Sequence, residues 1–306
     1  MVWFEGFEAR HFSVNGVQIF ARTGGLAGAP PLLLLHGFPQ THVLWQRVAQ
    51  QLRNQFQLVI PDLRGYGDSS QPPGEPDHAN YSKRTTANDM AALMAQLGHE
   101  RYAVAGHDRG GRVAHRLALD HAPHVAKLCV IDIAPTLDMY QATDMAFASA
   151  YYHWFHLIQP SPLPERMIGG DARFYLHWAL GGWGGAGGTA YIEPEALAEY
   201  ERCFCRPPAQ AGGLHPTLHA MCEDYRAAAG IDLEHDRASR AAGQKVAADI
   251  LVLWGERGVV QRLFKPLELW QAQCTGHVSG QAVPAGHFIP EELPQQTADQ
   301  LRKFFS

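Results

Sequence analysis

The sequence predicts an α/β fold, in which helices flank a mostly parallel sheet and a mainly helical cap is inserted between two of the strands. Two observations lead to this class. Short apolar runs such as "PLLLL" at 31–35 alternate with amphipathic stretches, a pattern typical of parallel strands buried on both faces. One long stretch, 135–235, interrupts that alternation and is rich in aromatic residues and helical patterns. We therefore expect a core in two parts around an inserted cap.

The expected elements follow in chain order. Residues 7–13 and 17–22 flank Asn15-Gly16, a dipeptide that favours the tight turn of a β-hairpin. The later strands are read from apolar runs, and most are followed by a stretch with helical spacing of its apolar residues. These strands are expected within 31–35, 56–69, 102–107, 127–132, 249–256 and 278–287, and the core helices near 45–52, 83–97, 109–119, 263–273 and up to 305.

The interruption sets the domain limits. We predict the first part of the core at 1–134, the cap at 135–235 and the second part of the core at 236–306. The cap should cover the carboxyl ends of the strands, where open α/β sheets bind ligands. It contains a glycine cluster from Gly181 to Gly188 and the stretch "RPPAQAGGLHP" at 206–216.

The composition excludes several classes of protein. The 306 residues carry 25 Lys and Arg against 30 Asp and Glu, and a net charge of −5 without a basic run argues against a nucleic-acid partner. No apolar run is long enough to cross a bilayer, and the N-terminus lacks the pattern of a signal peptide. The five cysteines show neither zinc nor disulfide spacing, which predicts reduced thiols. We expect a cytoplasmic protein with no metal or other cofactor and no membrane partner.

The segment "GHDRGG", Gly106 to Gly111, lies between a predicted strand and a predicted helix. It has the frame of a nucleophile elbow, G-x-S-x-G, with Asp108 in place of the serine. A carboxylate is ionised at neutral pH and can attack without the help of a base. The "HGFP" loop after another strand predicts an oxyanion hole formed by the backbone amides of Phe38 and Arg109. The structural alternative for Asp108 is a helix N-cap, a position that favours aspartate.

The predicted order of strands along the chain selects a base and an acid partner for Asp108. His287 follows the last predicted strand and should emerge at the same sheet edge as the elbow, whereas His277 precedes that strand. In this kind of fold an acid usually follows the strand "LVLWGE" in the arrangement W-G-x-x-D, but that position is Gly258 here. Asp132, at the end of the preceding core strand, is the substitute we expect. Glu256 is an alternative acid, and a turn cap is the structural alternative for Asp132.

Arg109 and Arg112 predict the charge of the substrate. Arg112 lies four residues after Asp108, so the two share one face of the elbow helix. A guanidinium matches a carboxylate in bidentate geometry, and two arginines beside the nucleophile would hold an anion there. The alternative is a buried ion pair with a structural carboxylate. We expect a small anionic substrate.

Several segments resemble a known family. "GHDRGGRVAHRLALDH", "VIDIAPT", "YYHWF" and "HAMCEDYRA" are similar to the haloacetate dehalogenases of the α/β-hydrolase superfamily, in particular the fluoroacetate dehalogenase type, through nearly the whole chain. The resemblance implies an α/β-hydrolase fold and the hydrolysis of fluoroacetate or chloroacetate to glycolate and halide through a covalent aspartyl ester. It also implies a homodimer. The glycine cluster and the stretch 206–216 depart from the pattern of the family.

The resemblance also implies residue roles. The catalytic residues would be Asp108 as nucleophile, His287 as base and Asp132 as its partner, with Arg109 and Arg112 on the substrate carboxylate. The donors to the departing halide would be His153, Trp154 and Tyr225. For His153 and Trp154 the structural alternative is packing inside the cap.

Two other functions could use the same features. An epoxide hydrolase shares the aspartate and the base and uses cap tyrosines as acids, for which Tyr151, Tyr152 and Tyr225 are available. Two arginines beside the nucleophile count against a neutral epoxide. A non-catalytic small-molecule receptor of this fold would not need an intact nucleophile, base and acid. Haloacetate hydrolysis is therefore the function that the sequence predicts.

Overall fold

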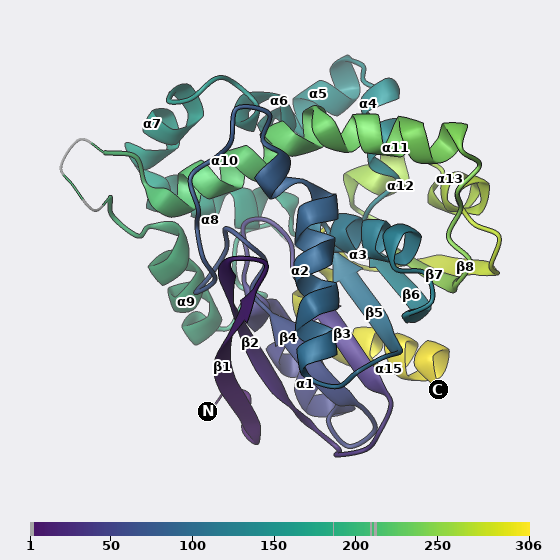
Figure 1. The fold of residues 1–306 in the computed structure, drawn as a ribbon. Helices are drawn as coiled ribbons and strands as arrows, with labels where there is room; N and C mark the ends of the chain where they lie inside the picture. The colour runs from purple at the N-terminus through teal and green to yellow at the C-terminus, as the bar shows by residue number, and fades with distance from the viewer. Residues whose placement is uncertain (1–2, 186, 209, 211–212) are drawn as a thin grey trace.

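The computed structural model describes residues 3–185, 187–208, 210 and 213–306. Part of the glycine cluster and part of the stretch 206–216 therefore lie outside the described residues. An eight-stranded sheet in the order β1-β2-β4-β3-β5-β6-β7-β8 forms the centre (Figure 1). The strands are β1 (Phe7–Val14), β2 (Val17–Gly25), β3 (Pro31–Leu35), β4 (Gln57–Pro61), β5 (Tyr102–His107), β6 (Val125–Ile131), β7 (Asp249–Gly255) and β8 (Val278–Val283).

The pairing of the strands confirms the predicted mostly parallel sheet. Only β1–β2 and β2–β4 are antiparallel, and every later pair in the described sheet is parallel. The turn between β1 and β2 is the predicted hairpin. Asn15 and Gly16 adopt φ values of +46° and +79°, the left-handed conformation that a two-residue hairpin turn requires.

Helices cover the sheet and build the cap. The core helices are α1 (Gln46–Leu52), α2 (Lys83–Gln96), α3 (Arg109–Asp120), α12 (Val259–Leu263), α13 (Pro266–Ala272), α14 (Ile289–Glu292) and α15 (Pro294–Phe305). The helices of the inserted segment are α4 (Thr136–Gln141), α5 (Met145–Ala150), α6 (Tyr152–Leu157), α7 (Leu163–Gly169), α8 (Ala172–Trp183), α9 (Pro194–Phe204), α10 (Pro216–Ala229) and α11 (Ile231–Ala241). Short 3-10 helices occupy His42–Trp45 and Ala79–Tyr81.

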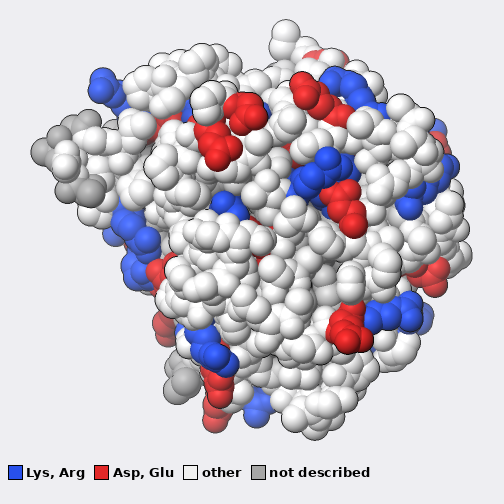
Figure 2. Space-filling view, viewed as in Figure 1, with Lys and Arg blue, Asp and Glu red and all other residues white. Residues whose placement is uncertain are grey.

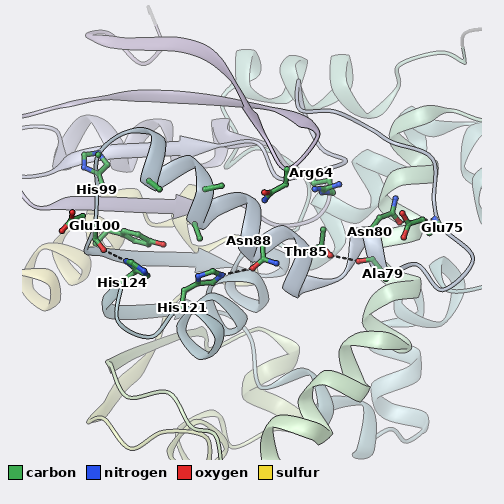
Figure 3. Close-up of a pocket in the computed structure, with 16 residues that line it drawn as sticks. Arg64, Glu75, Ala79, Asn80, Thr85, Asn88, His99, Glu100, His121 and His124 are labelled. Atoms are coloured by element: carbon green, nitrogen blue, oxygen red, sulfur yellow. Dashed lines mark hydrogen bonds between the residues drawn. The ribbon is translucent and has the colours of Figure 1, made fainter.

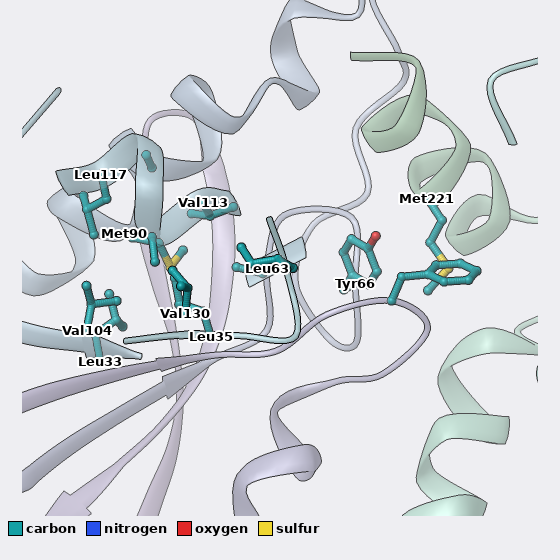
Figure 4. Close-up of a cluster of buried hydrophobic side chains, with 14 of the residues drawn as sticks. Leu33, Leu35, Leu63, Tyr66, Met90, Val104, Val113, Leu117, Val130 and Met221 are labelled. Atoms are coloured by element: carbon teal, nitrogen blue, oxygen red, sulfur yellow. The ribbon is translucent and has the colours of Figure 1, made fainter. Parts of the chain in front are cut away.

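The apolar run of β3 is buried on both faces because its side chains alternate between two cores. Leu33 and Leu35 belong to the cluster that includes the apolar faces of α2 and α3. Leu32 and Leu34 belong to a second cluster with α1 and α15 on the opposite face. Figure 4 shows part of the first cluster, in which Leu33, Leu35, Val104 and Val130 of the sheet lie near Met90, Val113 and Leu117 of the helices. This packing fixes α3, and with it the elbow, against the sheet.

The cap lies over the carboxyl ends of the strands. Phe38, which follows β3, stacks on His153 of α6 with ring centroids 6.1 Å apart. In Figure 1 the teal and green helices of the cap gather at one end of the sheet. The predicted cap limit at residue 235 falls inside α11, which continues to Ala241. The helix does not break there, and the division into domains stays a prediction.

One predicted helix is wrong in its extent. The single helix expected near 263–273 is two helices, α12 and α13, separated by Phe264 and Lys265. Pro266 has no amide hydrogen to continue the first helix, and its ring disfavours helical backbone at Lys265. Proline is instead well placed as the first residue of α13.

The surface agrees with the composition. Figure 2 shows acidic and basic side chains intermingled over the face in view, without a continuous basic surface. Within the described ranges, none of the helices combines the length and the apolar character needed to span a bilayer. The five cysteines all lie in the described part of the chain and are free thiols.

Candidate active site

Asp108 lies in the sharp turn between β5 and α3. Its φ of +48° is in the left-handed region, a conformation that costs a non-glycine residue about 1–3 kcal/mol. The turn needs glycine on both sides. A Cβ on Gly106 would lie 2.4 Å from the carbonyl oxygen of Gly110, and one on Gly110 would lie 2.4 Å from that of His36. The Asp108 carboxylate forms no N-cap hydrogen bond to α3, so the structural alternative does not account for it.

The backbone beside Asp108 supplies hydrogen-bond donors. The amide of Phe38 donates to Asp108 Oδ1 at 2.9 Å. Arg109 is the first residue of α3, and amides in the first turn of a helix have no acceptor within the helix. Of the two predicted oxyanion donors, the Phe38 amide thus contacts the carboxylate, and the Arg109 amide belongs to the residue that follows Asp108. They could stabilise negative charge on an oxygen bound to the Asp108 carbonyl carbon.

The structure brings His287 and Asp132 together at the carboxyl edge of the sheet. His287 Nδ1 lies 2.6 Å from Asp132 Oδ2, and His287 Nε2 lies 4.0 Å from Asp108 Oδ2. Because a carboxylate only accepts, Nδ1 carries the hydrogen of this bond and Nε2 is the free base of the neutral ring. The second oxygen of Asp132 accepts from the amide of Gly255 at 3.0 Å. Asp132 thus fixes the ring with Nε2 toward Asp108.

The alternatives for base and acid lie elsewhere. Glu256 is exposed, and His277 lies before β8 with its amide bonded to Asp249. Gly258, the position where the acid was expected, lies against Asp132. A Cβ on Gly258 would be 3.3 Å from Asp132 Oδ1. Asp132 therefore occupies the space that an acid side chain at residue 258 would reach.

Burial and charge shift the pKa values of these groups. Burial alone would raise the pKa of Asp108, but His287, His107, Arg109 and Arg112 together hold that pKa well below its ordinary value. Burial likewise disfavours the imidazolium of His287, yet the bond to Asp132 and the charges of Asp132 and Asp108 raise its pKa above the ordinary 6.5. His107 packs on the His287 ring, and burial lowers the pKa of His107 to about 3. Asp108 is therefore an anion beside a neutral His107.

Arg112 is the unsatisfied cation of the site. It is 3% exposed, and its Nη atoms contact the Thr136 hydroxyl at 2.9 Å, the Ala134 carbonyl at 3.2 Å and the Met139 sulfur at 3.3 Å. None of these groups is charged, and Arg112 Nε is buried without a partner among the described residues. An unpaired buried cation is costly, so this guanidinium is suited to bind an anion.

Arg109 was predicted to bind the substrate carboxylate, but most of its guanidinium is bonded to Asp224. Its Nε donates to Asp224 Oδ2 at 2.6 Å and its Nη2 to the Asp224 carbonyl at 2.7 Å, so the structural alternative, a buried ion pair, holds for this residue. Its remaining Nη1 is buried and unpaired in the described structure. Asp224 also pairs with the buried Lys83 and accepts from the Tyr66 hydroxyl. This network was missed because Asp224 is 115 residues from Arg109 and carries no local signal.

The three predicted halide donors are all buried near the nucleophile. His153, Trp154 and Tyr225 are 3%, 1% and 0% exposed. Trp154 lies under the Arg112 guanidinium, 4.7 Å from carbon to ring centroid, and Tyr225 lies under that of Arg109 at 4.0 Å. His153 Nδ1, Trp154 Nε1 and the Tyr225 hydroxyl have no hydrogen-bond partner among the described residues. Packing explains their burial but leaves their polar atoms unpaired.

Two further residues of the site escaped the haloacetate prediction. Tyr151 and Trp183 lie 6.3 Å and 6.2 Å from the His287 ring, and each has a buried polar atom without a partner in the described part of the chain. Tyr152 is half-buried and packs on Trp178 instead. Tyr151 immediately precedes the short helix α6 and His153 lies in its first turn, so the start of this helix brings both side chains to the site. Trp183 ends α8 inside the glycine cluster 181–188, and that cluster was the only available signal.

Two hollows of the surface differ in the residues that line them. One of about 300 Å³ reaches His287 between Tyr151 and Trp183, with Arg257 and Arg262 on its rim. A groove of about 1000 Å³ runs along α2 (Figure 3), and its polar groups include Arg64, His121 and His124. Arg64 is paired with Asp89, and the predicted nucleophile and base do not line this groove. The smaller hollow is therefore the one connected to the candidate site.

Comparison with known proteins identifies the family. A family profile described as the alpha/beta hydrolase fold matches residues 30–294, most of the chain. The chain belongs to the alpha/beta hydrolase family.

Relatives of this α/β hydrolase carry two kinds of name. It is 44% identical over 303 residues to a fluoroacetate dehalogenase of Burkholderia sp., a match that covers 99% of this chain and 95% of the relative. It is 31% identical to a soluble epoxide hydrolase of Corynebacterium sp. (strain C12), with 96% and 95% covered. The crystal structure of ALR0039 from Nostoc sp PCC 7120, provisionally described as an alpha/beta hydrolase, superimposes with a TM-score of 0.93 at 49% identity over 99% of both chains.

Proposed function

We propose that this α/β hydrolase hydrolyses haloacetates to glycolate and halide, with Asp108 as nucleophile. The observation that carries the proposal is Arg112, a buried guanidinium beside the nucleophile with no carboxylate partner among the described residues. Two unit charges of like sign about 4 Å apart repel by about 4 kcal/mol at an effective dielectric constant of about 20. An anionic substrate could approach Asp108 only if such a cation compensated this repulsion. The unpaired Nη1 of Arg109 would add a second donor.

In the first half of the reaction, an oxygen of Asp108 attacks the carbon that bears the halogen. A carbon–oxygen bond forms as the carbon–halogen bond breaks, and the halide leaves with the bonding electron pair. His153, Trp154 and Tyr225 would donate to the departing anion through the atoms that have no other partner in the described structure. The product is an ester in which the Asp108 oxygen carries a carboxymethyl group.

In the second half, His287 Nε2 takes a proton from water while the water oxygen attacks the Asp108 carbonyl carbon. The amides of Phe38 and Arg109 would stabilise the resulting oxyanion. The tetrahedral intermediate expels the glycolate oxygen, which takes the proton from His287. Esterification also removes the charge of Asp108, which contributes to the raised pKa of His287. The pKa of the base therefore falls when a neutral base is needed.

The test is halide release measured in parallel with fluoroacetate, chloroacetate and an epoxide. We expect glycolate and halide in equal amounts from at least one haloacetate. Diol formation from the epoxide without halide release from either haloacetate would contradict the proposal and favour the second candidate.

That second candidate, epoxide hydrolysis, is favoured by one observation. The hydroxyls of Tyr151 and Tyr225 are both buried and free of partners in the described structure, and burial raises the pKa of both groups. A pair of protonated phenols facing the nucleophile could donate to an epoxide oxygen as its ring opens. A neutral epoxide offers no negative charge to Arg112, which has no carboxylate bonded to it among the described residues, so haloacetates remain the proposed substrates.

A further inference from the structure

The loop that carries His287 is bonded to the cap through one carboxylate. Glu292, the last residue of α14, accepts the amide hydrogens of Gly185 and Gly286 at Oε2, at 2.8 Å and 2.9 Å. Its Oε1 accepts from the amide of Phe288 at 3.0 Å. Gly286 and Phe288 flank the base on either side, whereas Gly185 belongs to the glycine cluster of the cap. One side chain thus joins the two segments.

Backbone contacts reinforce this junction. The amide of His287 itself donates to the carbonyl of Trp183 at 2.9 Å, at the end of cap helix α8. Gly185 and Gly286 approach so closely that neither can carry a side chain. A Cβ on Gly286 would lie 2.2 Å from Gly185 N, and one on Gly185 would lie 2.5 Å from Gly286 N. The glycine cluster therefore allows the cap backbone to pack directly on the base loop.

We infer that Glu292 is a positioning residue that joins the cap to the base loop and so holds His287 for the hydrolysis of the ester. The inference rests on the proposed covalent chemistry at Asp108. Asp108 attacks without help from His287, because its carboxylate is already ionised. Ester hydrolysis, in contrast, needs Nε2 placed against a water molecule, and a displacement of about 1 Å can cost about a hundredfold in rate. Disturbing the junction should therefore slow the second half of the reaction and spare the first.

The experiment compares Glu292→Ala and Glu292→Gln with the parent protein by rapid quench with chloroacetate. Glu292→Ala should form the ester within about twofold of the parent rate and hydrolyse it between about tenfold and a hundredfold more slowly. A burst of about one halide per active site should precede the steady state, and mass spectrometry should find the ester on Asp108. Glu292→Gln keeps one acceptor oxygen and should show a smaller effect.

An independent variant and a matched control accompany these proteins. Gly185→Ala disturbs the same junction from the cap side and should give the same burst. Glu256→Gln makes the same change of charge at an exposed residue of the neighbouring loop and should behave like the parent. Loss of the Glu292 charge should also lower the pKa of His287, to which that charge contributes, and move the acid limb of hydrolysis to lower pH.

The outcomes separate this inference from the proposed function. A parent protein that releases no halide from any haloacetate would overturn the proposed function and this inference with it. A parent that is active while burst and steady state fall together in the Glu292 variants would overturn the inference alone, because a loss of folded protein lowers both. Steady-state rates equal to those of the parent in Glu292→Ala and Gly185→Ala would overturn it as well.

Discussion

At the scale of single residues, Asp108 has one property that a serine would lack at this position. Both would share the strained backbone conformation of the elbow, but only the carboxylate is kept ionised by the nearby cations. Asp108→Ala should therefore lower halide release by about a thousandfold or more. Asp108→Ser should not restore it, because a hydroxyl needs a base to become a nucleophile and His287 Nε2 lies 4.0 Å from Asp108 Oδ2, beyond hydrogen-bond distance. Substantial dehalogenation by Asp108→Ala, measured as halide release, would contradict the nucleophile assignment.

The two arginines should respond differently to substitution. Arg112→Leu removes the cation that compensates the charge of the substrate, so it should raise KM, lower kcat and reduce kcat/KM by about thirtyfold or more. Arg109→Lys should lower both activity and stability, because it breaks the two hydrogen bonds from the guanidinium to Asp224. Lys83 would then be the main cationic partner of the Asp224 carboxylate. Thermal melting should show a loss of stability for Arg109→Lys and little for Arg112→Leu. Full haloacetate activity of Arg112→Leu would make Arg112 a structural residue.

The pKa values give the pH dependence. His287 acts as a neutral base in the ester, where its pKa lies below the raised pKa of the free protein because the Asp108 charge is gone. Hydrolysis is therefore complete above the pKa of the ester form and is lost as the pH falls through it. The pKa of Asp108 is lowered, so ester formation continues in the same range. Halide should then appear as a burst at acid pH, and His287→Asn should show a burst of about one halide per site at every pH.

Nuclear magnetic resonance can check the charge coupling behind this profile. Asp108→Asn removes the charge that esterification would remove, so the pKa of His287 should be lower in this variant than in the parent. The acid limb of kcat should likewise lie below the pKa of His287 in the free parent protein. A histidine titration that is the same in both proteins would contradict the coupling.

At the scale of the elements, the acid partner comes from the end of β6, while the adjoining turn after β7 has Gly258 in contact range of it. Asp132→Asn should slow ester hydrolysis by about a hundredfold or more, because the base loses its orienting charge. Gly258→Asp added to Asp132→Ala, in which that space is open, places a carboxylate close to the lost one and should recover part of the rate. Single-turnover kinetics of the ester measure both effects, and Glu256→Gln should leave them unchanged.

At the scale of the whole molecule, the homodimer implied by the resemblance stays a prediction. The exposed apolar side chains that it could bury include Leu163 and Met167 of α7 and Phe174 and Trp178 of α8, which are 44–64% exposed. The members of each pair are four residues apart, so each pair lies on one face of its helix. Large exposed apolar side chains grouped in this way favour contact with a second copy of the chain.

Charge placed among those side chains should separate the two copies. Phe174→Glu should change the sedimentation behaviour from that of a dimer to that of a monomer, because a carboxylate would be buried at the interface. Met145→Glu introduces the same charge at an exposed residue of α5, outside these two pairs, and should leave the dimer intact. A wild-type protein that sediments as a monomer at micromolar concentration would contradict the homodimer.

The sequence by itself determined the architecture and the position of the candidate nucleophile. The alternation of apolar runs with helical spacing gave the mostly parallel sheet, and the G-x-D-x-G frame placed Asp108 in the turn between β5 and α3. Such patterns are readable because strand and helix periods are local properties of the chain. The order of residues along the strands also located His287 and Asp132, since the carboxyl ends of parallel strands share one edge.

Only the tertiary structure decided how the charges and donors are paired. In the folded protein Arg109 pairs with Asp224, whereas Arg112 has no carboxylate partner among the described residues. The sequence had predicted the same role for both arginines. The tertiary structure also brought Trp183 and Gly185 to the loop of His287 and Glu292, from a segment about a hundred residues away. Burial makes each unpaired polar group costly, so pairing follows from which side chains the packed helices bring into reach. That depends on helix placement in three dimensions, which no local period encodes.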